Sequence, residues 1–169
     1  MEPLDDAKFS GTKEVAEHLT IEASKLQPWI DEFVSRAGKI NSIEQFKGGQ
    51  SNPTYKITTD TKSLVLRRKP PGKLLPSAHA VDREYKVITA LYETDVPVPK
   101  TYGLCEDDDV AGTAFFVMDF LDGDLFWDPM IPSVTNKDRT EIYQNKNKTL
   151  AKLHSVDYKK IGLEGYGKP

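Results

Sequence analysis

Hydrophobic and polar residues alternate in three successive segments, at about residues 42–48, 53–59 and 63–69. A period of two indicates β-strands, and the short turn DTKS between the last two segments is typical of an antiparallel hairpin. The sequence therefore predicts a meander of three antiparallel strands.

A helical period replaces the alternation in AHAVDREYKVITALYET, residues 78–94, after the proline- and glycine-containing loop PPGKLLPS. Two more strand-like segments follow, at about residues 100–105 and 113–120, on either side of the charged turn EDDDVAG. This order predicts an α+β fold with a five-stranded antiparallel sheet and one crossing helix.

Helical patterns also flank the predicted sheet. The first 20 residues predict a loose lead-in with one helical turn around KEVAEHL. A helix is expected to follow, with Ser24 as its cap, Gln27 as the capping-box partner and Gly38 as its stop. A last helix is expected over residues 136–156, with apolar residues gathered near one face.

Composition narrows the classes of partner. The 169 residues carry 23 basic and 26 acidic side chains, a net charge of −3, which disfavours binding to nucleic acid or to an anionic membrane surface. The single cysteine, Cys105, cannot form an internal disulfide, and the longest apolar run, 114–118, is too short to span a bilayer. A cytoplasmic location is the expectation.

An acidic residue in the predicted long helix points toward the sheet. Glu84 shares its helical stripe with Val87 and Leu91, and a buried carboxylate requires a nearby cation. Arg67, on the third strand of the meander, is the preferred partner, and Lys69, on the same strand face, is the second choice. The alternative is that Glu84 belongs to the solvated edge of an amphipathic helix.

Two adjacent glycines stand in the first predicted hairpin, within FKGGQSNPTYKI. An ordinary hairpin turn needs such residues, but so does a phosphate group held against backbone N–H groups. The glycine hairpin, a cation on the third strand and an inward acid on the next helix, in this order, favour a nucleotide-phosphate site. An unrelated α+β fold with an ordinary glycine hairpin is the competing interpretation.

The motifs GGQSNPTY, LVLRRKPPG, VDREYKVITAL, VPVPK, FVMDFLDG and LAKLHSVD resemble the amino-terminal part of the aminoglycoside phosphotransferase and choline kinase superfamily, which has a protein-kinase-like fold. Through LRRKPPGKLLPSAHAVDREYKV and the closing LEGYG, the sequence is most similar to the kinase-like domain at the front of certain acyl-CoA dehydrogenase family members. The resemblance covers about residues 42–169.

The resemblance implies ATP as the cofactor and assigns a role to each matching position. The hairpin residues would lie over the phosphates, Arg67 would reach the α- and β-phosphates where such kinases usually have lysine, and Glu84 would hold Arg67. Met118 would line the adenine pocket, and the Asp119 carbonyl and the Leu121 N–H would meet the adenine edge. The expected hairpin contacts are Gly48, Gly49, Gln50, Ser51 and Asn52.

The same resemblance implies a missing part. Phosphoryl transfer in this fold needs an aspartate base and Asn and Asp ligands for Mg²⁺, and none of the three histidines opens an H-G-D or H-R-D sequence. The chain is therefore expected to be the ATP-binding portion of a small-molecule phosphotransferase, a truncated domain without transfer activity of its own, with Mg²⁺ bound only through missing residues. No metal is assigned to the acidic run 106–109.

The resemblance predicts three units. Residues 1–41 are a lead-in and a helix, and residues 42–121 are a nucleotide-binding N-lobe. Residues 122–169 are a connector and the first helix of an incomplete helical lobe. The acceptor would be a small molecule with a hydroxyl group, and the resemblance suggests a hydroxyacyl-CoA. Self-association through the uncovered last helix is also expected. The alternative function is a non-catalytic, kinase-like module that binds a nucleotide or a protein.

Overall fold

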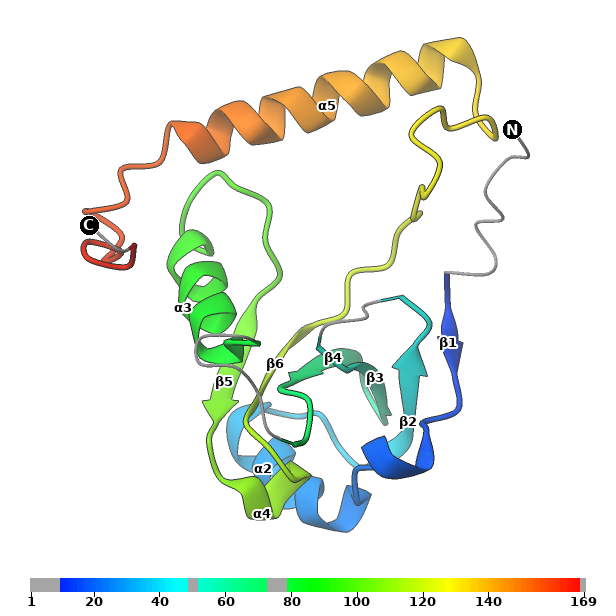
Figure 1. Cartoon of the computed structure of the whole chain (residues 1–169), viewed down its shortest axis with the longest axis vertical. Helices are drawn as coiled ribbons and strands as arrows, with labels where there is room; N and C mark the ends of the chain where they lie inside the picture. The colour runs from blue at the N-terminus through cyan, green and yellow to red at the C-terminus, as the bar shows by residue number, and fades with distance from the viewer. Residues whose placement is uncertain (1–9, 49–51, 73–78, 168–169) are drawn as a thin grey trace.

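A computed structural model describes residues 10–48, 52–72 and 79–167 (Figure 1). In this part of the chain six strands form one antiparallel sheet in the order β1-β2-β3-β4-β6-β5. The strands are β1 Thr12–Lys13, β2 Ile40–Phe46, β3 Thr54–Thr59, β4 Ser63–Arg68, β5 Thr101–Cys105 and β6 Phe115–Asp119. The helical elements are η1 Glu17–Leu19, α2 Ala23–Phe33, α3 Val81–Leu91, α4 Asp108–Ala111 and α5 Asn136–His154.

The α+β fold and its antiparallel sheet are confirmed, and the sheet has one strand more than the five expected. The additional strand is β1, in the segment expected to be a loose lead-in, and it pairs with the end of β2 through Thr12 and Phe46. The Thr12 hydroxyl also donates a hydrogen bond to Glu44, at 2.9 Å. The helical turn expected around KEVAEHL is the short 3-10 helix η1.

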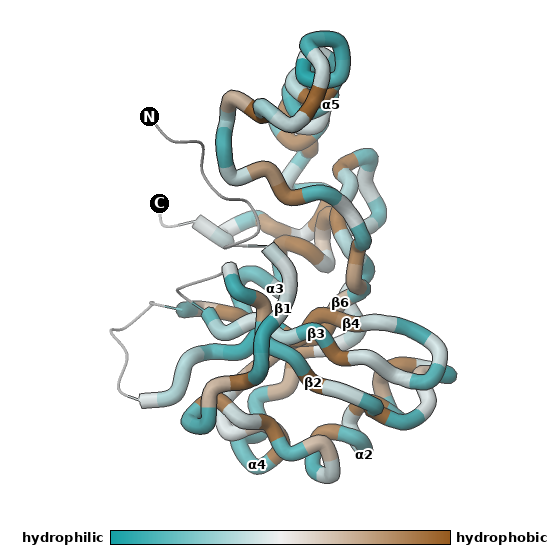
Figure 2. The backbone as a smooth tube through the Cα atoms, turned by 90° about the vertical axis from the view of Figure 1, so that its right-hand side faces the viewer, coloured by the Kyte–Doolittle hydropathy of each residue, from teal (hydrophilic) through white to brown (hydrophobic). Residues whose placement is uncertain are grey.

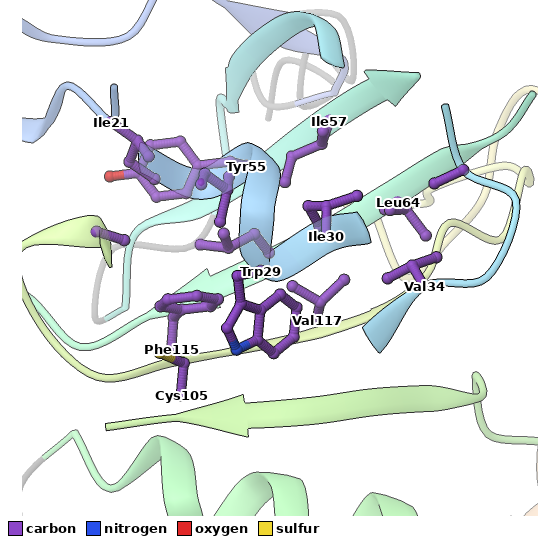
Figure 3. Packing of buried hydrophobic residues seen from close by; sticks show 14 residues of the cluster. Ile21, Trp29, Ile30, Val34, Tyr55, Ile57, Leu64, Cys105, Phe115 and Val117 are labelled. Atoms are coloured by element: carbon purple, nitrogen blue, oxygen red, sulfur yellow. The ribbon is translucent and has the colours of Figure 1, made fainter. Parts of the chain in front are cut away.

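Helix α2 covers one face of the sheet and forms the core with it (Figure 3). Leu26, Ile30 and Val34 are buried against the apolar side chains of β3, β4 and β6. Trp29 meets Phe115 edge to face, with the ring centroids 5.1 Å apart. This face supplies most of the apolar burial that stabilises the domain.

The N-terminal cap expected for this helix is wrong. Helix α2 begins after Glu22, and no side chain caps it. Gln27 instead donates a hydrogen bond to the Gly38 carbonyl at 3.1 Å and accepts one from the Ile40 N–H at 2.8 Å. Gln27 therefore connects α2 to the first residue of β2 rather than to its own first turn.

Helix α3 packs on the opposite face of the sheet. Phe116 alternates with the core residues Phe115 and Val117 along β6, and its ring lies 6.0 Å from that of Tyr85 in α3. The two faces of β4 and β6 thus have different functions. One face forms the core with α2, and the other faces α3.

Helix α5 stands apart from the sheet in both orientations (Figures 1 and 2). None of its residues is buried. The segment after α5 returns to α3, where Tyr166 accepts a hydrogen bond from Arg83 through its carbonyl and donates one to the Arg83 carbonyl through its hydroxyl. None of the helices among the described residues combines the length and apolar character that crossing a membrane requires.

Candidate functional site

Arg67 and Glu84 form an ion pair on the α3 face of the sheet, as expected from the sequence. The Arg67 Nε donates to Glu84 Oε2, and Nη2 donates to Oε1 at 3.3 Å, so the guanidinium and the carboxylate meet side by side. The two side chains are 28% and 35% exposed. A bidentate pair with this partial burial fixes the orientation of the arginine more firmly than a surface ion pair does.

The alternation of β4 decides which of its two arginines enters the site. Val65 and Arg67 face α3, whereas Leu64 and Leu66 lie in the core on the α2 face. Arg68 follows the core side and is 3% exposed, with hydrogen bonds from Nη1 to the Ala111 carbonyl and from Nη2 to the Leu19 carbonyl. Burial lowers the pKa of Arg68, and Arg68 acts as a structural cation that joins η1 and α4.

Two polar residues, one on each side of Arg67 in the sequence, hold the acidic partner of the ion pair. Asn52 is 3% exposed, and its Nδ2 donates to Glu84 Oε1 at 2.9 Å. His79 lies just before α3, with its Nδ1 2.9 Å from Asn52 Oδ1. Thr54 contributes from β3, where its hydroxyl accepts a hydrogen bond from Arg67 Nη1 at 3.1 Å.

A cavity of about 930 Å³ opens beside the ion pair. It is lined by sheet residues from β2, β3, β4 and β6 and by the connector that leaves β6. Five of the sequence-predicted site residues border it: Gly48, Arg67, Met118, Asp119 and Leu121. Its volume and partly apolar lining are typical of a pocket for a small organic ligand.

Aromatic residues form part of the cavity wall. Phe46 of β2 and Phe120 border the cavity and stack with their centroids 6.3 Å apart, and the ammonium group of Lys56 lies 4.5 Å from the Phe120 ring. The hydroxyl of Tyr102 donates to Asp119 Oδ1 at 2.6 Å, which anchors the residue at which the connector begins. Burial, reinforced by this hydrogen bond, raises the pKa of Tyr102.

The structure thus brings most of the predicted residues together, in two groups. Arg67, Gly48 and the three residues around the connector border the cavity, whereas Asn52 and Glu84 stand behind Arg67. Gly49, Gln50 and Ser51 lie outside the described residues, so their expected phosphate contacts stay predictions. The sequence analysis missed His79, Thr54 and the stacked pair Phe46 and Phe120 as site residues.

The acidic run 106–109 has a local structural function. Asp107 accepts a hydrogen bond from the Asp109 N–H at 2.9 Å and caps the short helix α4. Among the residues that the structure describes, no cluster of three His, Cys, Asp or Glu side chains has the geometry to hold a metal ion.

The antiparallel sheet with its crossing helix is a kinase-like lobe, and comparison with known proteins gives its family. Residues 42–169 match the phosphotransferase enzyme family, and the chain belongs to it. A solved structure of a protein from Ralstonia eutropha JMP134, assigned as an aminoglycoside phosphotransferase, superposes with a TM-score of 0.75 at 44% identity. The match covers 89% of this chain and 43% of that one.

Curated relatives are acyl-CoA dehydrogenase family proteins. The chain is 53% identical over 131 residues to the Arabidopsis thaliana protein named probable acyl-CoA dehydrogenase IBR3, and 39% identical over 165 residues to human acyl-CoA dehydrogenase family member 11. These alignments cover 75% and 94% of this chain, but only 16% and 21% of the relatives. The chain therefore corresponds to a small part of these longer proteins.

Proposed function

We propose that this lobe binds ATP in the cavity beside Arg67, as the nucleotide-binding part of a small-molecule phosphotransferase. The observation that carries the proposal is the orientation of Arg67, which Glu84 holds at the wall of a cavity that Met118 and Leu121 also border. Three of the five guanidinium N–H groups are engaged, by Glu84 and Thr54. One N–H on each terminal nitrogen stays available for a phosphate oxygen.

The connector after β6 supports the part of the proposal that concerns the adenine ring of ATP. Met118 would lie against the adenine ring. The Asp119 carbonyl and the Leu121 N–H would form hydrogen bonds with the edge of that ring. The Leu121 N–H donates to no other residue of the described chain. ATP and GTP are not separated by backbone contacts of this kind, so the choice between the two nucleotides is part of the test.

The proposed reaction of the longer protein is transfer of the γ-phosphoryl group of ATP to a substrate hydroxyl. The base that accepts the hydroxyl proton and the ligands that hold Mg²⁺ would come from residues beyond this chain. The similarity to acyl-CoA dehydrogenase family proteins favours a hydroxyacyl-CoA as the acceptor. These 169 residues alone are expected to bind nucleotide weakly and to transfer no phosphate.

Binding is tested by titrating the 169-residue chain with ATP, GTP and adenosine, followed by NMR chemical shifts. Arg67→Met is expected to weaken ATP binding by about tenfold, because charged hydrogen bonds to the phosphates are lost, and to leave adenosine binding unchanged. Lys69→Met is the matched control, since it removes a cation from the same strand face without removing the held guanidinium. Equal losses in both variants, or no shift with ATP in the wild type, would contradict the proposal.

The second candidate is a non-catalytic module that binds a nucleotide or a protein. Both functions would use the same cavity beside Arg67, so nucleotide binding alone does not separate them. The two functions separate when the chain is extended by the next hundred or so residues of its gene, about one further domain in size, and assayed for ATP turnover with hydroxylated acyl thioesters. Turnover identifies the phosphotransferase, and nucleotide binding without turnover identifies the module.

A further inference from the structure

The buried Asn52 side chain is fully engaged behind the ion pair rather than in the cavity. Its Nδ2 donates to Glu84 Oε1 at 2.9 Å, and its Oδ1 lies 2.9 Å from His79 Nδ1. Its carbonyl accepts a hydrogen bond from the Thr54 hydroxyl at 3.1 Å. A side chain that is 3% exposed and satisfied at both ends has little freedom to turn toward a ligand.

The chemistry of the partners fixes the direction of these hydrogen bonds. An ionised Glu84 can only accept, so the amide nitrogen of Asn52 must face it and the amide oxygen must face His79. An amide oxygen can only accept as well, so His79 Nδ1 must carry a proton. The resulting chain of donors runs from His79 through Asn52 to Glu84, and Glu84 accepts from Arg67 at the far end.

The backbone at His79 is shaped for this contact. Its φ is +58°, a left-handed conformation that is uncommon for residues other than glycine and in which histidine is tolerated better than most. Ala80, the next residue, is the N-cap of α3, and its side chain makes no capping hydrogen bond. His79 thus lies at the start of the helix that carries Glu84, with its ring directed at Asn52.

We propose that His79 is a positioning residue, which acts through Asn52 to hold the Glu84 carboxylate in the orientation that presents Arg67 to a phosphate group. The hydrogen-bonded chain itself follows from the geometry of the described residues. Its effect on ATP binding rests on the proposed function.

The first test is spectroscopic and needs no nucleotide. Neutral histidine in water favours the Nε2–H tautomer, so long-range ¹H–¹⁵N spectra of the 169-residue chain are expected to show His79 protonated at Nδ1. Finding the Nε2–H form in the wild type would overturn the proposal, and this readout depends on no variant folding.

The second test follows the Arg67 Nε–H by hydrogen exchange in three proteins. His79→Gly accepts the left-handed backbone and removes the donor, and is expected to raise the exchange rate several-fold. His79→Asn keeps a donor near the Nδ1 position and also tolerates positive φ, so it is expected to restore most of the protection. Unchanged exchange in His79→Gly would overturn the proposal.

The third test compares ligands in the same proteins. His79→Gly is expected to weaken ATP binding by about threefold to tenfold, the effect of losing one hydrogen bond next to a charged pair, with adenosine binding unchanged and His79→Asn close to wild type. An equal loss for ATP and adenosine would indicate a general structural defect and would overturn the positioning function. If the wild type binds no ATP while the tautomer and exchange results hold, the positioning chain stands and the nucleotide proposal fails.

Discussion

Arg67 divides its guanidinium between two partners, and the geometry of this contact differs from that of a lysine. Nε and Nη2 face Glu84, and Nη1 reaches the Thr54 hydroxyl on the neighbouring strand. A planar group with donors at three nitrogens can be held from two sides and still present N–H groups to a third partner, whereas an ammonium is a single point charge. This arrangement leaves N–H groups of Arg67 for the phosphate contact that we propose.

Cys105 provides a prediction about stability and pH. Burial raises the pKa of its thiol above the usual value of 9.0, and the nearby acidic side chains of Glu106, Asp107 and Asp108 raise it further. Because the pKa of the thiol is higher in the folded state than in the unfolded state, its contribution to stability is fully present when the pH lies below the unfolded-state pKa. This contribution is lost as the pH rises through the folded-state pKa. The urea midpoint of the wild type is expected to fall above about pH 9.

The control for this prediction is Cys105→Ala, which removes the ionisation. Its midpoint is expected to be lower than that of the wild type near pH 7, because a buried side chain becomes smaller, but to change less between about pH 8 and about pH 9.5. This window lies below the usual pKa of 10.0 for tyrosine, so Tyr55 and Tyr102 contribute little there. Parallel curves for the two proteins would refute the assignment to the thiol.

At the residue scale, the sequence predicted the site residues whose positions follow from a helical or strand period. It did not predict the site residues that lie outside such a pattern. Glu84 and Arg67 were predicted as a pair because the helical and strand periods each place one of them on the face between helix and sheet. The sequence analysis assigned no site function to His79. Its contact with Asn52 depends on a left-handed backbone and on a residue 27 positions away, and neither has a pattern in the sequence.

At the scale of elements, alternation and helical period predicted five of the six strands and the helix that crosses the sheet. Strand β1 was missed because two residues are too few to show a period, and its pairing depends on the end of β2. The cap proposed at Ser24 failed because the real function of Gln27 is a tertiary contact with the Gly38 carbonyl. Local patterns could not show that this contact outweighs the capping box.

The packing of α2 against β5 gives a prediction at this scale. Gly103 lies under the stacked rings of Trp29 and Phe33, and an added Cβ would lie 3.0 Å from Trp29 Cζ2 and 3.1 Å from Phe33 Cδ1. Gly103→Ala is expected to lower the free energy of unfolding by about 1 to 3 kcal/mol, because the rings and the helix must shift.

Chemical denaturation with tryptophan fluorescence measures this change. Gly123→Ala is the matched control, since a Cβ added at Gly123 meets nothing within 4 Å, and its effect on stability is expected to be small. If Gly103→Ala were as stable as Gly123→Ala, the packing of α2 on β5 would be looser than the described contacts indicate.

At the scale of the whole molecule, the described residues form two parts with different degrees of burial. The sheet and its two helices have an apolar core, whereas the connector and α5 present large apolar side chains to solvent, among them Leu121, Leu125, Met130 and Leu150. The sequence predicted the uncovered helix from its apolar stripe. It could not predict the cavity, because the residues that line the cavity come from four strands and the connector, which meet only in the folded chain.

The exposed side of α5 leads to a prediction about assembly. Leu150 and Leu153 are 48% and 43% exposed on one side of its last turns, and Tyr143 is 37% exposed near its middle. In the isolated 169-residue chain we propose that a second copy covers these side chains, because apolar surface removed from water favours association. Light scattering after size-exclusion chromatography is expected to give a mass that rises above the monomer value with concentration.

The double variant Leu150→Glu and Leu153→Glu is expected to stay monomeric. The control is the double variant Lys146→Glu and Lys152→Glu, which changes the charge of the same helix without removing apolar side chains. A wild-type chain that stays monomeric at all concentrations, or a control that dissociates as fully as the leucine variant, would contradict association through this apolar surface.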